Sequence, residues 1–265
     1  MNKVLKTVII ILLAVSVLSF CATAAVRIID KAGIIAFNME ELSGSLKGSS
    51  TIVTHNLGEL RFRGIEAATA AKVTVRSADD PNRDVILRVN ENLAERVELK
   101  VRDGILKISF RNATYSFKSL SKVTFEVSVP HCEGLSSLEA VAAAEIEVTS
   151  PLTAPKIEVE ASGAAKISAP VDCTECEAEA AGASKIILTG RCTKLEVEAA
   201  GASKIDASEC ESVNCAAEAV GASKVSVWCT GSLSADAVGA SKVTYKGDCA
   251  IKLSSVGASS VRKID

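Results

Sequence analysis

A four-residue motif recurs along the C-terminal half of the chain at nearly constant spacing. Gly163-Ala-Ala-Lys is followed by related copies that begin at Gly182, Gly201, Gly221, Gly239 and Gly257, and Ala142 opens a degenerate earlier copy. Successive glycines are 19, 19, 20, 18 and 18 residues apart. Such a period is typical of repeat proteins, in which each unit buries its apolar side only against its neighbours.

The residues before each glycine alternate between apolar and polar, which favours strands over helices. Six positions before the glycines lie Ile157, Cys176, Leu195, Cys215, Leu233 and Ile251, and four positions before them lie Val159, Ala178, Val197, Ala217, Ala235 and Leu253. The residues five and three positions before the glycines are mostly glutamate. A unit of about 19 residues is also too short for a helix pair, because helical repeats take about 33 residues or more.

A second short strand follows each glycine, since a β-branched residue comes four positions later, preceded by a lysine in every copy except the last, where Ser260 replaces it. Glycine suits the bend between the two strands because it adopts positive φ without steric cost. Rungs of this kind stack about 4.8 Å apart and share one core. We therefore predict an all-β fold, a right-handed parallel β-helix (a β-solenoid). Only 3% of residues are aromatic, so we expect a narrow, filled interior.

The chain divides into three predicted segments. Residues 1–24 form a signal peptide, with Lys3 and Lys6, a short apolar stretch and the cleavage motif Ala22-Thr23-Ala24. Lipidation at Cys21 is the second interpretation of this leader. Residues 25–47 are predicted to be a linker or tether. Residues 48–265 form the solenoid domain, with irregular opening rungs or a capping sheet at 48–130 and regular rungs at 131–265.

Charged residues form two predicted columns on the surface of the stack. Three positions before the glycines lie Glu160, Glu179, Glu198, Glu218 and Asp236, and three positions after them lie Lys166, Lys185, Lys204, Lys224 and Lys242. One interpretation is a solubilising surface; the other is a contact surface for a carbohydrate or an envelope or matrix polymer. The formal net charge of −2 offers no basic patch for nucleic acid.

Cysteines recur at one predicted corner of the stack, at Cys173, Cys192, Cys210, Cys229 and Cys249. Buried free thiols and a ladder of disulfides between rungs are both open interpretations, and a thiolate metal site is a third. Stacked Cβ atoms about 4.8 Å apart slightly exceed the usual disulfide range. We expect the serine column at 184, 203, 223 and 241 to form hydrogen bonds at the bend. No catalytic, cofactor-binding or metal residues are predicted.

The repeats resemble the head GIN domain, a family named for auto-transporter adhesins of Gram-negative envelopes. The same resemblance extends over residues 48–265 through Gly64-Ile65-Glu66, Ala71-Lys72-Val73-Thr74-Val75, Asp103-Gly104-Ile105-Leu106-Lys107-Ile108 and Val127-Ser128-Val129-Pro130. It implies a right-handed β-helix with an export signal, located in the periplasm, at the outer membrane or on the cell surface, and it carries no catalytic residues over to this chain.

Three functions follow as hypotheses. The first is a non-enzymatic envelope or surface protein that acts as an adhesin or contacts a matrix. The second is a polysaccharide-processing enzyme on a β-helix scaffold, by analogy of fold alone. The third is a periplasmic assembly element that forms homo-oligomers through unpaired terminal rungs.

Overall fold

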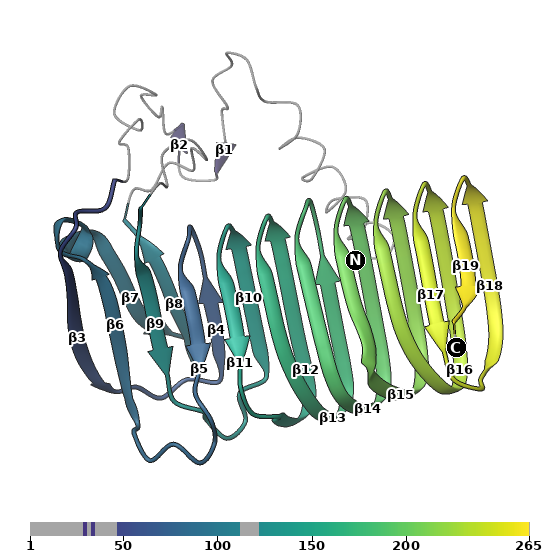
Figure 1. Cartoon of the computed structure of the whole chain (residues 1–265), viewed down its shortest axis with the longest axis horizontal. Coiled ribbons are helices and arrows are strands. Elements are labelled where there is room, and N and C mark those ends of the chain that lie inside the picture. The colour runs from purple at the N-terminus through teal and green to yellow at the C-terminus, as the bar shows by residue number, and fades with distance from the viewer. Residues whose placement is uncertain (1–28, 31–32, 35–46, 112–121, 265) are drawn as a thin grey trace.

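Parallel strands stacked rung on rung make up most of the computed structural model, which describes residues 29–30, 33–34, 47–111 and 122–264 (Figure 1). The predicted signal peptide, Cys21 and most of the predicted linker lie outside these residues. β1 (Ile29–Asp30) and β2 (Gly33–Ile34) form a separate antiparallel pair. Among the residues described, none of the helical structure is long and apolar enough to cross a membrane.

The regular rungs confirm the predicted β-solenoid. They consist of β12 (Leu152–Gly163), β13 (Lys166–Ala180), β14 (Lys185–Gly201), β15 (Lys204–Gly221), β16 (Lys224–Gly239), β17 (Lys242–Lys246), β18 (Ala250–Gly257) and β19 (Ser260–Lys263). Each rung pairs in parallel with the next, and equivalent repeat positions lie opposite one another. Each of β13 to β16 runs along both faces of the stack and turns at the corner opposite the glycine bend.

The glycine bends stack directly on one another. Gly201, for example, has a φ of 81°, and a Cβ added there would lie 2.9 Å from the carbonyl oxygen of Gly182 in the preceding rung. Both the backbone conformation and the close approach between rungs therefore favour glycine.

The unequal repeat lengths are absorbed at the corner opposite the bends. The register between β14 and β15 shifts between Ile187 and Thr189. The register between β15 and β16 shifts twice, once between Ala207 and Glu211 and once between Ser212 and Asn214. Bulges of this kind accommodate extra residues in one strand. The glycine bends and the columns beside them consequently stay aligned.

The chain begins its first rung well before the regular repeats. β4 (Gly64–Ala67) and β5 (Lys72–Val75) pair in parallel with β10 (Ser137–Ala142) and β11 (Glu145–Val148), which in turn stack on β12 and β13. Thr69 and Ala142 occupy the bend of these two rungs, with φ values of 69° and 66°. The degenerate copy at Ala142 is thus a rung. The rung with Thr69 at its bend falls within the irregular opening rungs predicted at 48–130, although this bend was not located from the sequence.

A less regular sheet closes the N-terminal end of the stack (Figure 1). Its elements are β3 (Ile52–Glu59), β6 (Asp84–Asn90), the 3₁₀ helix η1 (Glu91–Arg96), β7 (Val97–Arg102), β8 (Ile105–Phe110) and β9 (Phe125–Val129). β8 and β9 pair in parallel with β4 and β5. The antiparallel pairs of this sheet are β7 with β8, β6 with β9, and β3 with β6.

The core runs along the axis of the stack and consists of the predicted inward columns. Val159 and Val197 are 0% exposed, as expected for side chains covered by rungs on both sides. Leu253 is 42% exposed and Ile251 is 52% exposed, although they occupy the same columns. They lie in β18, which pairs only with β16 among the described strands, so within the described residues one side of this strand has no rung above it.

Candidate contact surface

The five predicted lysines form one column in the structure. Adjacent strands place Lys166, Lys185, Lys204, Lys224 and Lys242 directly opposite one another. All five are partly or fully exposed. Because neighbouring strands lie about 4.8 Å apart, the column presents one amine per rung along the axis of the stack.

Acidic side chains moderate the repulsion within this column. Glu145 takes the lysine position in its own rung, between Lys72 and Lys166, and Lys166 Nζ lies 2.7 Å from Glu145 Oε1. This hydrogen bond raises the pKa of Lys166 above its usual range. Lys204 Nζ lies 2.8 Å from Asp206 Oδ2 on the same strand.

The predicted acidic residues form a second column on the other side of the bend. Glu160, Glu179, Glu198, Glu218 and Asp236 are in register. The column continues toward the N-terminus through Glu139 and Glu66. Burial raises the pKa of Glu139, and the charges of Glu66 and Glu160 raise it further.

The N-terminal members of both columns were not predicted from the sequence. Glu66 and Lys72 lie three residues before and after Thr69, which is the spacing of the acidic residue and the lysine around the five repeat glycines from Gly163 to Gly239. That spacing was the available signal, although threonine replaces the glycine of the motif.

A mixed column lies beside the acidic one. Lys156, Glu175 and Lys194 are stacked in register. The carboxylates of Glu175, Glu177 and Glu196 lie within 4.8 Å of one another. Lys194 Nζ is 2.5 Å from Glu175 and 3.4 Å from Glu196, and Lys156 Nζ is 2.9 Å from Glu177. Lys156 and Lys194 thus offset part of the negative charge of this partly buried cluster.

The cysteines of the predicted ladder share a corner but do not form one straight column. Cys173 lies opposite Cys192, whereas Cys210 lies opposite Gly190 and Cys229 lies opposite Ser212. The structure has all eight described cysteines as free thiols. The disulfide ladder remains a prediction.

The thiols at this corner differ in acidity. Hydrogen bonds from Cys176 and Cys192 lower the pKa of Cys173 to about 4, because they stabilise its thiolate. The same hydrogen bonds, together with burial, raise the pKa of Cys176 and Cys192. Cys173 is also the half-buried member of the three, whereas Cys176 and Cys192 are buried, so we expect it to react first with an alkylating reagent.

The serine column forms hydrogen bonds at the bend, as predicted. Ser184, Ser203, Ser223 and Ser241 are buried. Their hydroxyls donate to the carbonyl oxygens of Ala161, Ala180, Ala199 and Ala219 at 2.9–3.0 Å. Each bond crosses the bend and joins two successive rungs.

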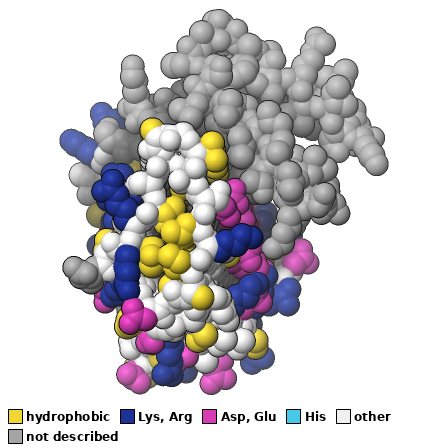
Figure 2. All heavy atoms as spheres, turned by 90° about the vertical axis from the view of Figure 1, so that its right-hand side faces the viewer, with side chains coloured by type: hydrophobic (Ala, Val, Ile, Leu, Met, Phe, Trp, Pro, Cys, Tyr) yellow, Lys and Arg dark blue, Asp and Glu magenta, His cyan; other side chains and the backbone are white. Residues whose placement is uncertain are grey.

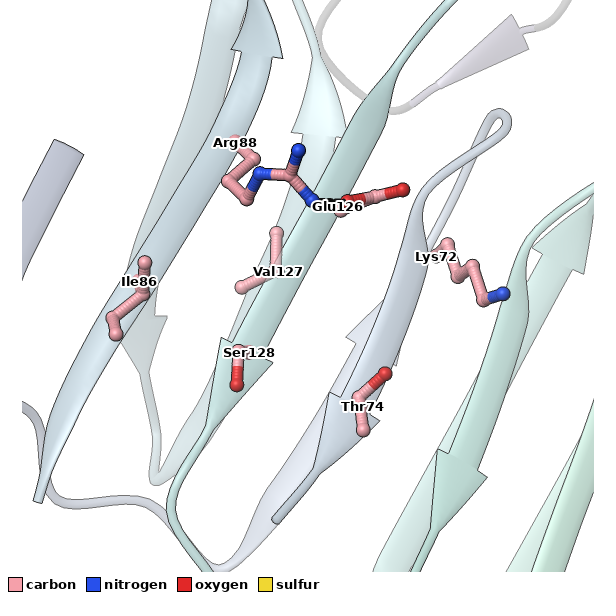
Figure 3. A pocket seen from close by; sticks show the side chains of 7 residues that line it. All are labelled: Lys72, Thr74, Ile86, Arg88, Glu126, Val127 and Ser128. Carbon is pink, nitrogen blue, oxygen red and sulfur yellow. Dashed lines mark hydrogen bonds and ion pairs between the residues drawn. The ribbon is translucent and has the colours of Figure 1, made fainter. Parts of the chain in front are cut away.

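A shallow depression of about 310 Å³ lies on the N-terminal sheet (Figure 3). β5, β6 and β9 line it, and Arg88 and Glu126 point toward one another across it, with Arg88 Nη1 2.6 Å from Glu126 Oε2. Of the described residues that line this depression, Glu126 is the only one with a carboxylate. Glycoside hydrolysis uses two carboxylates, so the lining does not supply that chemistry.

Comparisons with known proteins agree with this architecture. The family described as "Putative auto-transporter adhesin, head GIN domain" matches residues 61–249. A solved structure of a "putative adhesin" from Bacteroides fragilis is similar, with a TM-score of 0.70 and 18% identity over 82% of this chain and 98% of that chain. None of the curated proteins matches the chain.

Two further solved structures have the same fold. A "putative adhesin" from Parabacteroides merdae has a TM-score of 0.61 and 19% identity, over 83% of this chain and 99% of that chain. A "putative lipid binding protein" from Parabacteroides distasonis has a TM-score of 0.61 and 21% identity, over 82% of this chain and 98% of that chain. At these identities the likeness establishes the fold alone.

Proposed function

The chain belongs to the head GIN domain family, and from that premise we propose that it is an exported, non-enzymatic envelope protein that contacts an acidic polymer through its lysine column. The observation that carries this proposal is the in-register column of Lys166, Lys185, Lys204, Lys224 and Lys242. The names of the similar solved structures support a role in adhesion, and the leader predicted at residues 1–24 supports export to the envelope or the cell surface.

A polyanion that lies along the axis of the stack would meet one amine at each of the five successive rungs from Lys166 to Lys242. The chain holds these amines on paired backbone strands, so binding would order few residues. Each exposed contact contributes only about 0–1 kcal/mol. A polymer that spans several rungs adds such contacts within one molecule, and an acidic polysaccharide of the envelope or matrix has the required chemistry.

The test is binding of the chain to an immobilised polyuronate, with a neutral glucan as the reference polymer. We expect saturable binding to the polyuronate that weakens as salt increases. The triple variant Lys185→Glu, Lys204→Glu, Lys224→Glu should bind about tenfold to hundredfold more weakly, given about 0.5–1 kcal/mol for each contact.

A matched control reverses three charges in the same rungs on the other face: Glu179→Lys, Glu198→Lys, Glu218→Lys. This variant should bind the polyuronate as well as the unmodified chain or better. If both variants lost the same affinity for the polyuronate, the loss would reflect a general effect on the fold and would not support the lysine column as the binding surface. No binding to the polyuronate would refute the proposal.

A further inference from the structure

The two ends of the stack differ in how they are closed. At the N-terminal end, β3 carries a register irregularity between Asn56 and Glu59, and β7 carries alternating charges that include the Glu98–Lys100 ion pair. η1 lies between β6 and β7 and buries Leu93. Bulges and charged residues are the usual devices that keep an edge strand from pairing with another chain.

The C-terminal end lacks such closure in the part of the chain that the structure describes. β18 pairs only with β16, and β19 pairs only with β17, so each has one edge without a strand beside it. Ile251 and Leu253 belong to the inward columns yet are 52% and 42% exposed, and Val256 is 60% exposed. Figure 2 shows hydrophobic side chains in the middle of this end, with charged side chains around them.

The occupant that fits this end best is a rung like those already in the stack. Ile251 and Leu253 continue columns that Leu233 and Ala235 fill one rung earlier. A second copy of the chain offers the same edge and the same columns. We expect it to dock through its own C-terminal end, because the irregularity in β3 and the charges along β7 disfavour strand pairing at the N-terminal end.

We propose that two copies of the chain pair end to end through β18, in an antiparallel manner about a twofold axis, and form a closed dimer. Antiparallel pairing centred on Leu253 would place Ile251 opposite Ser255 of the second copy and Lys252 opposite Ser254. This register keeps the inward columns of the two copies continuous, and it does not place Lys252 opposite itself. We expect growth to stop at two copies, because the irregularity in β3 and the charges along β7 disfavour pairing at the two remaining ends.

The size of the end face sets the expected strength. An eight-residue strand is about 26 Å long, and the two faces with their side chains span about 20 Å, which gives about 500 Å² for each copy. A total of about 1,000 Å² is at the lower limit for a specific interface. The dimer should therefore dissociate in the micromolar range or above.

The test is sedimentation velocity of the full chain over a concentration series, together with hydrogen–deuterium exchange. We expect the mass to double as concentration increases, and exchange in β18 to slow while exchange in β3 and β7 stays unchanged. Leu253→Lys should abolish the dimer. Val101→Lys, an equivalent change on the exposed edge strand β7, should leave it intact.

Several results would overturn the proposal. A monomer at every concentration would do so, whether the face is bare or covered by the chain's own N-terminal residues. Assemblies larger than a dimer would contradict the closed N-terminal end. A dimer that survives Leu253→Lys would place the interface elsewhere. None of these results bears on polyuronate binding, which involves a different surface.

Discussion

Replacing Gly201 by alanine tests whether contact between rungs or backbone conformation requires glycine at the bends. Gly201 has a φ of 81°, which an alanine adopts at a cost of about 1–2 kcal/mol. The added Cβ would also lie 2.9 Å from the carbonyl oxygen of Gly182. That atom belongs to the backbone of the neighbouring rung and cannot rotate away, so the rungs must separate locally.

Gly134 supplies a matched control, because alanine at this position incurs only the free-energy cost of the positive φ. Its φ is 75°, close to that of Gly201, but an added Cβ would have no atom within 4 Å. Alanine also restricts the unfolded chain, which offsets about 0.4–1 kcal/mol in both variants. We expect Gly134→Ala to lower the free energy of unfolding by about 1 kcal/mol. Overpacking should add about 1–3 kcal/mol for Gly201→Ala.

Urea unfolding followed by far-ultraviolet circular dichroism measures both differences. The single tryptophan, Trp228, gives a second signal from β16, the rung that follows β15. Gly201→Ala should have the lower midpoint by both signals. Equal midpoints for the two variants would show that the close approach to Gly182 has no energetic weight. The reasoning about stacked bends would then be wrong.

Two further predictions follow from the pKa shifts. Glu139 has a pKa raised by burial and by neighbouring carboxylates, so ionisation of this carboxyl destabilises the folded chain as pH rises. Glu139→Gln should therefore increase the urea midpoint at pH 7. The gain should disappear below about pH 4, where this carboxyl is protonated in both the folded and the unfolded chain. Equal midpoints at pH 7 would contradict this. Cys173 has a lowered pKa, so brief alkylation at about pH 6 should modify it before Cys132 and Cys249, which are also half-buried but have raised pKa values. Peptide mass spectrometry shows the order, and faster modification of Cys132 or Cys249 would refute it.

The regular rungs could be predicted because one short motif repeats with little change. Lys185 and Lys204 are 19 residues apart and each follows a glycine by three residues, so their register follows from the motif itself. The alternation around Val197 likewise identifies the inward face without any knowledge of neighbouring strands.

The opening rung and the cysteine corner could not be predicted in the same way. Thr69 replaces the glycine, and the next rung of the column begins only after the chain has formed β6 to β9, so no period links the two. Cys210 lies opposite Gly190 because the extra residue of its unit is accommodated near this corner. The position of a bulge depends on packing between strands, which the spacing of cysteines does not reveal.

The alignment of the bends despite unequal repeat lengths makes the chain adjustable by whole units. Removal of residues 183–201 would join Gly182 to Ala202, which is an equivalent junction, and would shorten the stack by one step of about 4.8 Å. The shortened chain would lose one lysine and one glutamate from the columns while both ends stayed as they are. Duplication or deletion of whole repeat units within the gene can therefore change the length of the solenoid in steps of one rung, about 4.8 Å each.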